Sequence, residues 1–299
     1  MFNFRLLFVA LVWGINFSVV KFSLADFEPL AFTVVRFALA ALFLMAVMRA
    51  GKTSFFIERR DRFAVVKLGF LGITVYNIFF MYGLRSTTAA NSALLISLSP
   101  LAGALLSAAS GKEQLTTRIN AGLGLASLGV FLIIRSHHDT FTFSSSGIAG
   151  DLLTLCATLA WALYTITAKP LLEKYPAITV TTYSMLAGSV LLLPFSLQEL
   201  TRQRWSAVSL LSWSAMAFAA FIAAGLAYVF WYQGVKRIGV TRTMVYHYLM
   251  PFAAVLFAAV ALGEKISALQ LFGGLAILLG VYLVQGRPGS SAGGKEKTA

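Results

Sequence analysis

The chain has 299 residues, of which 59% are hydrophobic and 12% charged, and its mean hydropathy is +0.81. A soluble domain would have about 25% charged residues, so this composition excludes that class and indicates helices that span a bilayer. The net charge of +13 lies in short basic clusters between apolar runs, which is typical of cytoplasmic loops and argues against a nucleic-acid partner. The single cysteine, Cys156, excludes a disulfide framework within the chain, and we expect it in the core.

The first apolar run, residues 4–24, has two interpretations. Arg5 precedes it and the sequence SLAD follows it, as in a cleaved signal peptide. However, the run is long for a signal peptide, and Trp13 is followed eight residues later by a lysine, a pairing that recurs at Trp161 in the second half. We therefore interpret the run as a retained transmembrane helix.

Nine further helices follow, and the strongest basic cluster lies between the second and the third. This loop, residues 49–62, contains five Arg or Lys residues. We favour its interpretation as a cytoplasmic determinant of topology over the alternative, a site for anionic lipid. The further helices are predicted over residues 29–48, 65–84, 89–110, 118–134, 149–169, 178–197, 207–235, 240–262 and 267–285.

The sequence contains an internal repeat at an offset of 151 residues. GLRSTTAANSALLISLSP at 83–100 corresponds to GVKRIGVTRTMVYHYLMP at 234–251, with glycine and proline at the same ends, and the same offset carries Gly122 onto Gly273 and Gly129 onto Gly280. Such a repeat indicates that the chain consists of two copies of one structural unit. The predicted organisation is a first repeat (1–136), a linker (137–147), a second repeat (148–286) and a disordered cytoplasmic tail (287–299).

The fold predicted from these features is an all-α integral membrane protein of ten transmembrane helices. Because each repeat has five helices, an odd number, the second enters the membrane from the opposite side and the repeats are inverted. Most Lys and Arg residues fall on one side if both termini are cytoplasmic, so we place the chain in the cytoplasmic membrane in that orientation.

Three segments resemble the EamA-type repeat of the drug/metabolite transporter superfamily. They are LVWGINFSVVKFSLADFEPLAFTVVRFALAALFL, YGLRSTTAANSALLISLSPL and GEKISALQLFGGLAILLGVYLV. The resemblance covers residues 5–136 and 149–285, although AWALYTITAKPLLEKYP in the second copy lacks the Trp-Gly pair of the first. It implies ten helices in an inverted 5+5 repeat and secondary transport, usually export of a metabolite, without specifying which one.

Polar and aromatic residues inside the apolar helices predict a central substrate cavity. Packing is the alternative for the aromatic residues, and helix–helix hydrogen bonding for the serines. Pro100 and Pro251 lie at equivalent positions, where a structural kink is favoured over one that flexes during transport. The predicted cavity residues are Trp13, Asn16, Tyr76, Asn77, Phe80, Ser92, Ser97, Trp161, Tyr164, Tyr228, Trp231, Tyr246 and His247.

Arg36 is a charged residue well inside a predicted helix. It can extend to the outer headgroups, pair with Glu28 or a tyrosine, or bind a substrate carboxylate. The family pattern usually has arginine here, so a structural role is at least as well supported as binding.

No HExxH or Walker A sequence is present, so we predict a transporter rather than an enzyme, without metal or cofactor. The predicted function is export of small organic metabolites by alternating access, with amino acids, especially aromatic or apolar ones, favoured. The alternatives are a passive facilitator and a membrane-embedded lipid-modifying enzyme. Protons are a candidate coupling ion, with His247 as a candidate carrier. We expect a small-molecule substrate and the lipid bilayer as partners, and a monomer or homodimer.

Overall fold

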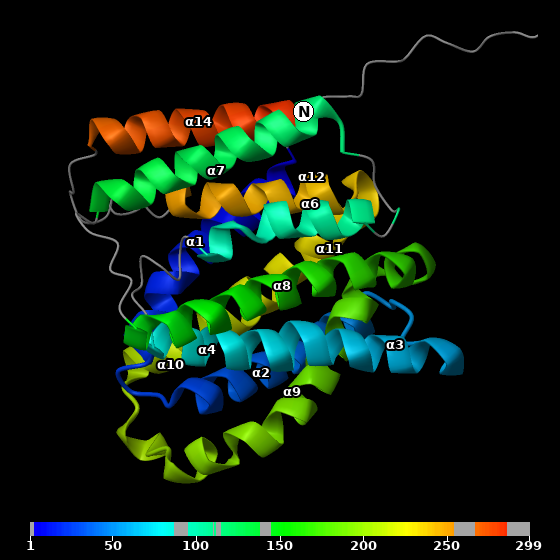
Figure 1. Ribbon diagram of the computed structural model, residues 1–299. Coiled ribbons are helices and arrows are strands. Elements are labelled where there is room, and N and C mark those ends of the chain that lie inside the picture. Colours follow the sequence, from blue (N-terminus) through cyan, green and yellow to red (C-terminus); the bar gives the residue numbers. More distant parts are fainter. Residues whose placement is uncertain are drawn as a thin grey trace, which may run out of the picture.

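A computed structural model describes residues 3–86, 95–109, 111, 115–137, 145–253 and 267–285. Figure 1 shows these residues as a bundle of helices that run roughly parallel to one another. The predicted contact Ser92, residues 138–144 of the predicted linker, and the predicted tail lie outside the described residues.

The described residues contain helices and no strand, which confirms an all-helical protein. Among them, seven helical spans are long and apolar enough to cross a membrane, and Phe4–Asn16 and Leu95–Ala109 are shorter apolar helices. The elements are α1 (Phe4–Ser23), α2 (Pro29–Ala50), α3 (Arg59–Gly69), η1 (Phe70–Val75), α4 (Tyr76–Ser86), α6 (Ser99–Ala109), α7 (Thr117–His137), α8 (Ser145–Lys174), α9 (Ala177–Arg202), η2 (Trp205–Ala207), α10 (Leu210–Ala217), η3 (Phe218–Leu226), α11 (Ala227–Ile238), α12 (Val240–Met244), η4 (Val245–Tyr248) and α14 (Ala268–Gln285).

Several helices extend beyond the apolar runs that predicted them. The helix predicted from residue 65 begins as α3 at Arg59, and α9 continues to Arg202 rather than to residue 197. The physical reason is that hydropathy marks the part of a helix that lies in hydrocarbon, whereas its backbone hydrogen bonds continue into the polar headgroup region.

Cys156 is exposed, which corrects the expectation that it lies in the core. Leu152, Leu159 and Leu163 on the same helix, α8, are also exposed, and their spacing places all four residues on one face. In a membrane protein the outside of the bundle is as apolar as the inside, so an apolar run does not show which residues are buried.

Glycines hold α7 and α14 in close contact, and these two helices lie side by side in Figure 1. A β-carbon at Gly129 would lie 2.5 Å from the carbonyl oxygen of Gly273, and one at Gly280 would lie 2.5 Å from that of Gly122. The contact is reciprocal between repeat-related positions, so these glycines are needed for close approach of the two backbones.

Two π-helical segments interrupt the long spans that contribute to the centre of the bundle. The segment η1 joins α3 to α4, and η3 joins α10 to α11. A π turn changes the hydrogen-bonding register and rotates the residues that follow it, and such turns are frequent at functional sites. Both segments directly precede residues that line the central cavity described below.

Candidate functional site

A cavity of about 460 Å³ lies between the helices, within the range of about 300–1,000 Å³ usual for small-molecule sites. Its lining comes from α1, α2, α4, α8, η3, α11 and η4, together with residues that flank these elements. The lining residues are Trp13, Asn16, Val20, Leu24, Pro29, Arg36, Phe37, Tyr76, Asn77, Phe80, Met81, Ile96, Trp161, Ala223, Ala224, Tyr228, His247 and Met250.

An aromatic cluster of three tryptophans and His247 forms one wall of this cavity. The ring of Trp13 lies 5.4 Å from that of Trp161 and 5.2 Å from that of Trp231. The imidazole of His247 lies 4.6 Å from the Trp231 ring and stacks on Trp161 at 5.4 Å. The edge-to-face packing of Tyr228 on Trp13 and Trp161 extends the cluster. Aromatic pairs at these distances stabilise each other by about 0.5–1.5 kcal/mol beyond burial.

The π-helical segment η3 fixes the position of Trp13. The backbone N–H of Ala227 donates to the carbonyl of Ile222, five residues earlier, rather than to that of Ala223 as in an α-helix. The indole Nε1 of Trp13 donates to the carbonyl oxygen of Ala223 at 2.8 Å. The change of register therefore makes a helix carbonyl available to hold a side chain from α1.

His247 is oriented by a hydrogen bond beside a proline. Its Nδ1 lies 2.9 Å from the hydroxyl of Ser99, the residue before Pro100. Pro251 lacks the N–H that would bond the carbonyl of His247 in an α-helix, and residues 245–248 form the 3₁₀ segment η4. Pro100 therefore directly follows one partner of this hydrogen bond between the halves of the chain, and Pro251 lies one helical turn after the other.

Arg36 brings a positive charge into the cavity wall. Its side chain is buried, its Nη2 donates to Oδ1 of Asn77 at 3.2 Å, and its Nε has no hydrogen-bond partner among the described residues. Its Cζ lies 4.4 Å from the ring centroid of Phe37. The amide of Asn77 is held in turn by the carbonyl of Ile73, at 2.7 Å. Arg36 takes part in neither of the two ion pairs found in the described part of the chain.

Most of the predicted cavity residues lie together. Eight of them and Arg36 line the cavity, whereas Trp231 belongs to the aromatic cluster but is not a lining residue. Tyr164 is fully buried against Trp161 and Tyr232, and Ser97 is buried outside the lining. The hydroxyl of Tyr246 accepts a hydrogen bond from the backbone N–H of Asn3, near the start of α1, and Tyr246 is not a lining residue.

The predicted cavity residues do not include the aliphatic side chains of the lining. Val20, Met81, Ile96 and Met250 are ordinary residues of apolar helices, and nothing in their type distinguishes a cavity wall from packing. For Phe37 the sequence offers one indication of a place in the lining, which is that it directly follows Arg36.

These features define a multi-pass helical membrane protein with an aromatic cavity that contains an arginine. The chain belongs to the EamA-like transporter family, whose model matches residues 3–135 and 148–285. The protein is therefore a membrane transporter and not an enzyme.

Relatives match over almost the whole chain. An uncharacterized transporter of Bacillus subtilis, YyaM, is 30% identical over 91% of this chain and 90% of its own. A probable amino-acid metabolite efflux pump of Salmonella typhimurium is 28% identical, covering 94% of this chain and 93% of the relative. A probable terminal-alkyne amino-acid exporter of Streptantibioticus cattleyicolor is 26% identical, covering 94% and 92%.

The fold also resembles that of a known crystal structure. The TM-score is 0.83 at 20% sequence identity, and the match covers 95% of this chain and 96% of the other. At this identity the likeness shows a shared fold and carries no information about substrate.

Proposed function

We propose that this protein exports amino acids, with aromatic or apolar ones preferred, across the cytoplasmic membrane by alternating access. The observation that carries the proposal is the combination of Arg36 and the aromatic cluster in one cavity. A buried cation without a counter-ion is unfavourable, and a substrate carboxylate would supply that counter-ion. The names of two relatives, an amino-acid metabolite efflux pump and an amino-acid exporter, support the same substrate class and direction.

Each part of an amino acid has a suitable partner in the lining. The guanidinium of Arg36 can bind the carboxylate through charge-assisted hydrogen bonds. The indole faces of Trp13 and Trp161 can pack against an apolar side chain, and they also attract an ammonium group. The lining residues include no Asp or Glu, so the cavity as described favours a carboxylate over a cationic substrate.

We further propose that the chain forms ten transmembrane helices in two inverted repeats. The offset of 151 carries η1, residues 70–75, onto residues 221–226 within η3. It also carries Asn77 onto Tyr228 and Phe80 onto Trp231, which follow the two π segments in the same way. The two separate family matches support the same division. Alternating access would then exchange the conformations of the two halves around the central cavity.

Cysteine labelling tests the inversion and the cytoplasmic placement of both termini. In a Cys156→Ala background, Ser54→Cys is expected to react with a membrane-impermeant maleimide only from the cytoplasmic side, and Asp139→Cys only from outside. The native cysteine must be removed because it is exposed. The measurement compares labelling in intact cells and in inverted vesicles. Reaction of both positions from the same side would contradict the inverted repeat.

Counterflow in proteoliposomes tests the substrate class. Vesicles loaded with unlabelled phenylalanine or leucine are expected to take up the labelled amino acid faster than protein-free vesicles, whereas uncharged sugars, which lack the carboxylate that Arg36 would bind, are not. Counterflow with sugars but with no amino acid would contradict the proposal.

A passive facilitator is the second candidate, favoured because the described lining residues include no Asp or Glu. An imposed pH gradient separates the two functions. Uphill accumulation of the amino acid identifies secondary transport, and equilibration without accumulation identifies a facilitator.

A further inference from the structure

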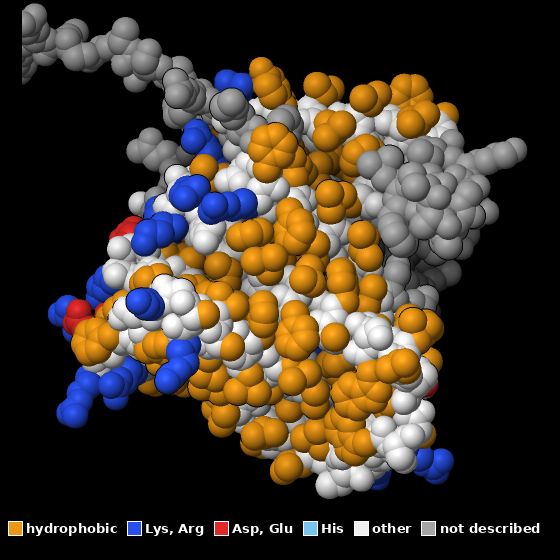
Figure 2. Space-filling view, turned by 180° about the vertical axis from the view of Figure 1, so that it is seen from behind, with side chains coloured by type: hydrophobic (Ala, Val, Ile, Leu, Met, Phe, Trp, Pro, Cys, Tyr) orange, Lys and Arg blue, Asp and Glu red, His pale blue; other side chains and the backbone are white. Residues whose placement is uncertain are grey.

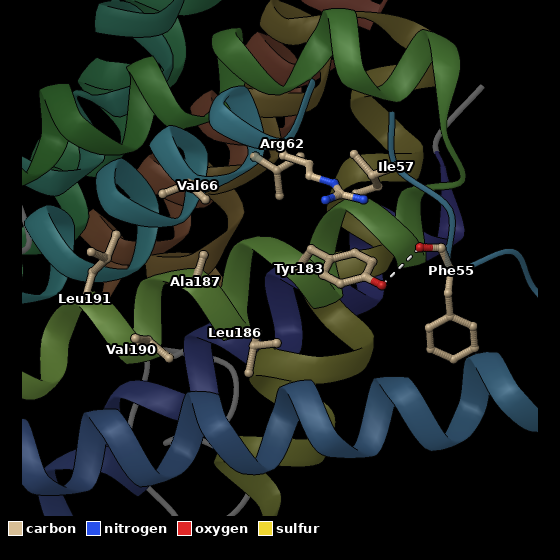
Figure 3. A pocket seen from close by; sticks show the side chains of 10 residues that line it. Phe55, Ile57, Arg62, Val66, Tyr183, Leu186, Ala187, Val190 and Leu191 are labelled. Carbon is tan, nitrogen blue, oxygen red and sulfur yellow. Dashed lines mark hydrogen bonds between the residues drawn. The ribbon is translucent and has the colours of Figure 1, made fainter. Parts of the chain in front are cut away.

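A second hollow lies away from the central cavity and shares no lining residue with it. It has a volume of about 460 Å³ and lies between α3, α9 and the segment 51–58 that connects α2 to α3. Figure 3 shows lining side chains from each of these three elements. We call it the lateral groove, and its lining residues are Phe55, Ile57, Arg62, Val65, Val66, Tyr183, Leu186, Ala187, Val190 and Leu191.

The walls of the lateral groove are apolar and open to the outside of the bundle. Val190 is 56% exposed and Val66 is 41% exposed, and both belong to spans long and apolar enough to cross a membrane. Figure 2 shows the broad apolar surface of the molecule, with most of the basic side chains in view on its left side. Side chains exposed on such a surface lie against acyl chains, so the groove is accessible to lipid.

The segment that covers the end of the groove is held in place. The hydroxyl of Tyr183 on α9 donates to the carbonyl oxygen of Phe55 at 3.0 Å, which Figure 3 marks with a dashed line. The side-chain hydroxyl of Thr179, one turn earlier, donates to the carbonyl of Ser54 at 2.9 Å. These two bonds join α9 to the segment and give the groove a fixed shape.

Arg62 supplies a positive charge at this groove. In Figure 3 its guanidinium lies between Ile57 and Tyr183. The neighbouring acidic residues are occupied by other cations, since Glu58 pairs with Arg60 at 2.6 Å and Asp61 pairs with Lys174 at 3.0 Å. Arg62 is in neither of these ion pairs, which are the two found among the described residues. An apolar groove with such a cation at it matches a ligand that has a hydrocarbon chain and an anionic head.

We propose that the lateral groove is a binding site for one anionic phospholipid, with the phosphate on Arg62 and an acyl chain along Val66, Leu186 and Val190. The lipid comes from the leaflet that faces the basic loop 49–62. Arginine suits this role because its planar fork binds phosphate oxygens through two parallel hydrogen bonds. The site is independent of the central cavity, so this proposal does not depend on the transported substrate.

Native mass spectrometry of the full-length protein in mild detergent tests the site. The protein is titrated with phosphatidylglycerol and, separately, with phosphatidylcholine of the same acyl chains. The wild type is expected to bind one phosphatidylglycerol about tenfold more tightly than phosphatidylcholine, because the choline ammonium of phosphatidylcholine compensates the charge of the phosphate that Arg62 binds. Arg62→Gln is expected to remove this preference. Arg59→Gln, which changes an arginine of the same helix outside the groove, is expected to retain it.

A second pair of variants tests the hydrocarbon part of the site. Val190→Trp fills the groove and is expected to weaken phosphatidylglycerol binding, whereas Leu197→Trp, exposed on the same helix outside the groove, is not. Excess inorganic phosphate is expected not to displace the lipid. Equal binding of the two lipids by the wild type, an unchanged preference in Arg62→Gln, or displacement by phosphate alone would overturn the proposal. Thermal unfolding of each variant identifies any that is misfolded, and a folded Arg62→Ala variant, which also lacks the charge, then replaces Arg62→Gln.

Discussion

An Arg36→Gln variant is expected to lose about a hundredfold in apparent affinity for amino acids, equivalent to about 3 kcal/mol. In the proposed complex the substrate carboxylate is the counter-ion of Arg36, so removal of the guanidinium leaves a buried carboxylate without its partner. The remaining contacts in the aromatic cluster are unchanged, and substrate binding is therefore weakened rather than redirected. The measurement is the concentration dependence of counterflow in proteoliposomes.

A matched pair of ligands separates this role from a structural one. An amino-acid amide has no carboxylate, so Arg36→Gln is expected to weaken inhibition of counterflow by the acid much more than inhibition by the amide. Arg49→Gln, at the exposed end of the same helix, is the control for a change of charge outside the cavity and is expected to behave as wild type. Equal losses of inhibition by the acid and by the amide would indicate that Arg36 has a structural role. A lower thermal stability without a change in affinity would indicate the same.

The sequence predicted the chemical composition of the cavity better than its geometry. Trp13, Trp161 and His247 stood out because aromatic and polar side chains deep inside apolar helices are costly unless they line a cavity or find partners. In the structure the rings of these three residues lie within 5.4 Å of one another. Depth along a helix can be counted from the sequence, so this part of the prediction was accessible.

The rotation of each helix about its own axis, which decides which side chains face the cavity, could not be derived from the sequence in the same way. The predicted cavity residues include Tyr246 together with His247, on the assumption that residues 240–262 form a regular α-helix. The structure has the 3₁₀ segment η4 at 245–248, where a turn takes about three residues instead of 3.6, and the tyrosine hydroxyl accepts from Asn3 instead. The π segments η1 and η3 likewise have no sequence signal of their own, yet they set which side chains follow into the cavity.

A His247→Gln variant is expected to weaken both amino-acid exchange and gradient-driven accumulation, by about 2 kcal/mol in apparent affinity. His247 packs against the rings of Trp13, Trp161 and Trp231, and its Nδ1 is hydrogen-bonded to Ser99. Glutamine can keep a hydrogen bond to the serine but cannot reproduce the flat ring that fills the space between the indoles. Loss of the ring therefore changes the contacts that the whole aromatic cluster makes with the substrate.

The alternative role of His247 is to carry the coupling proton, and the same variant distinguishes the two roles. A proton carrier is needed for uphill accumulation but not for exchange of internal for external substrate, so its loss would abolish accumulation and leave exchange intact. We favour the contact role because no carboxylate is among the described residues that line the cavity with His247, and three aromatic rings surround the imidazole. Ser99→Ala, which removes only the Nδ1 partner, is expected to show a smaller loss of the same kind in both assays. Wild-type exchange and accumulation in His247→Gln would contradict both roles and make His247 part of the packing.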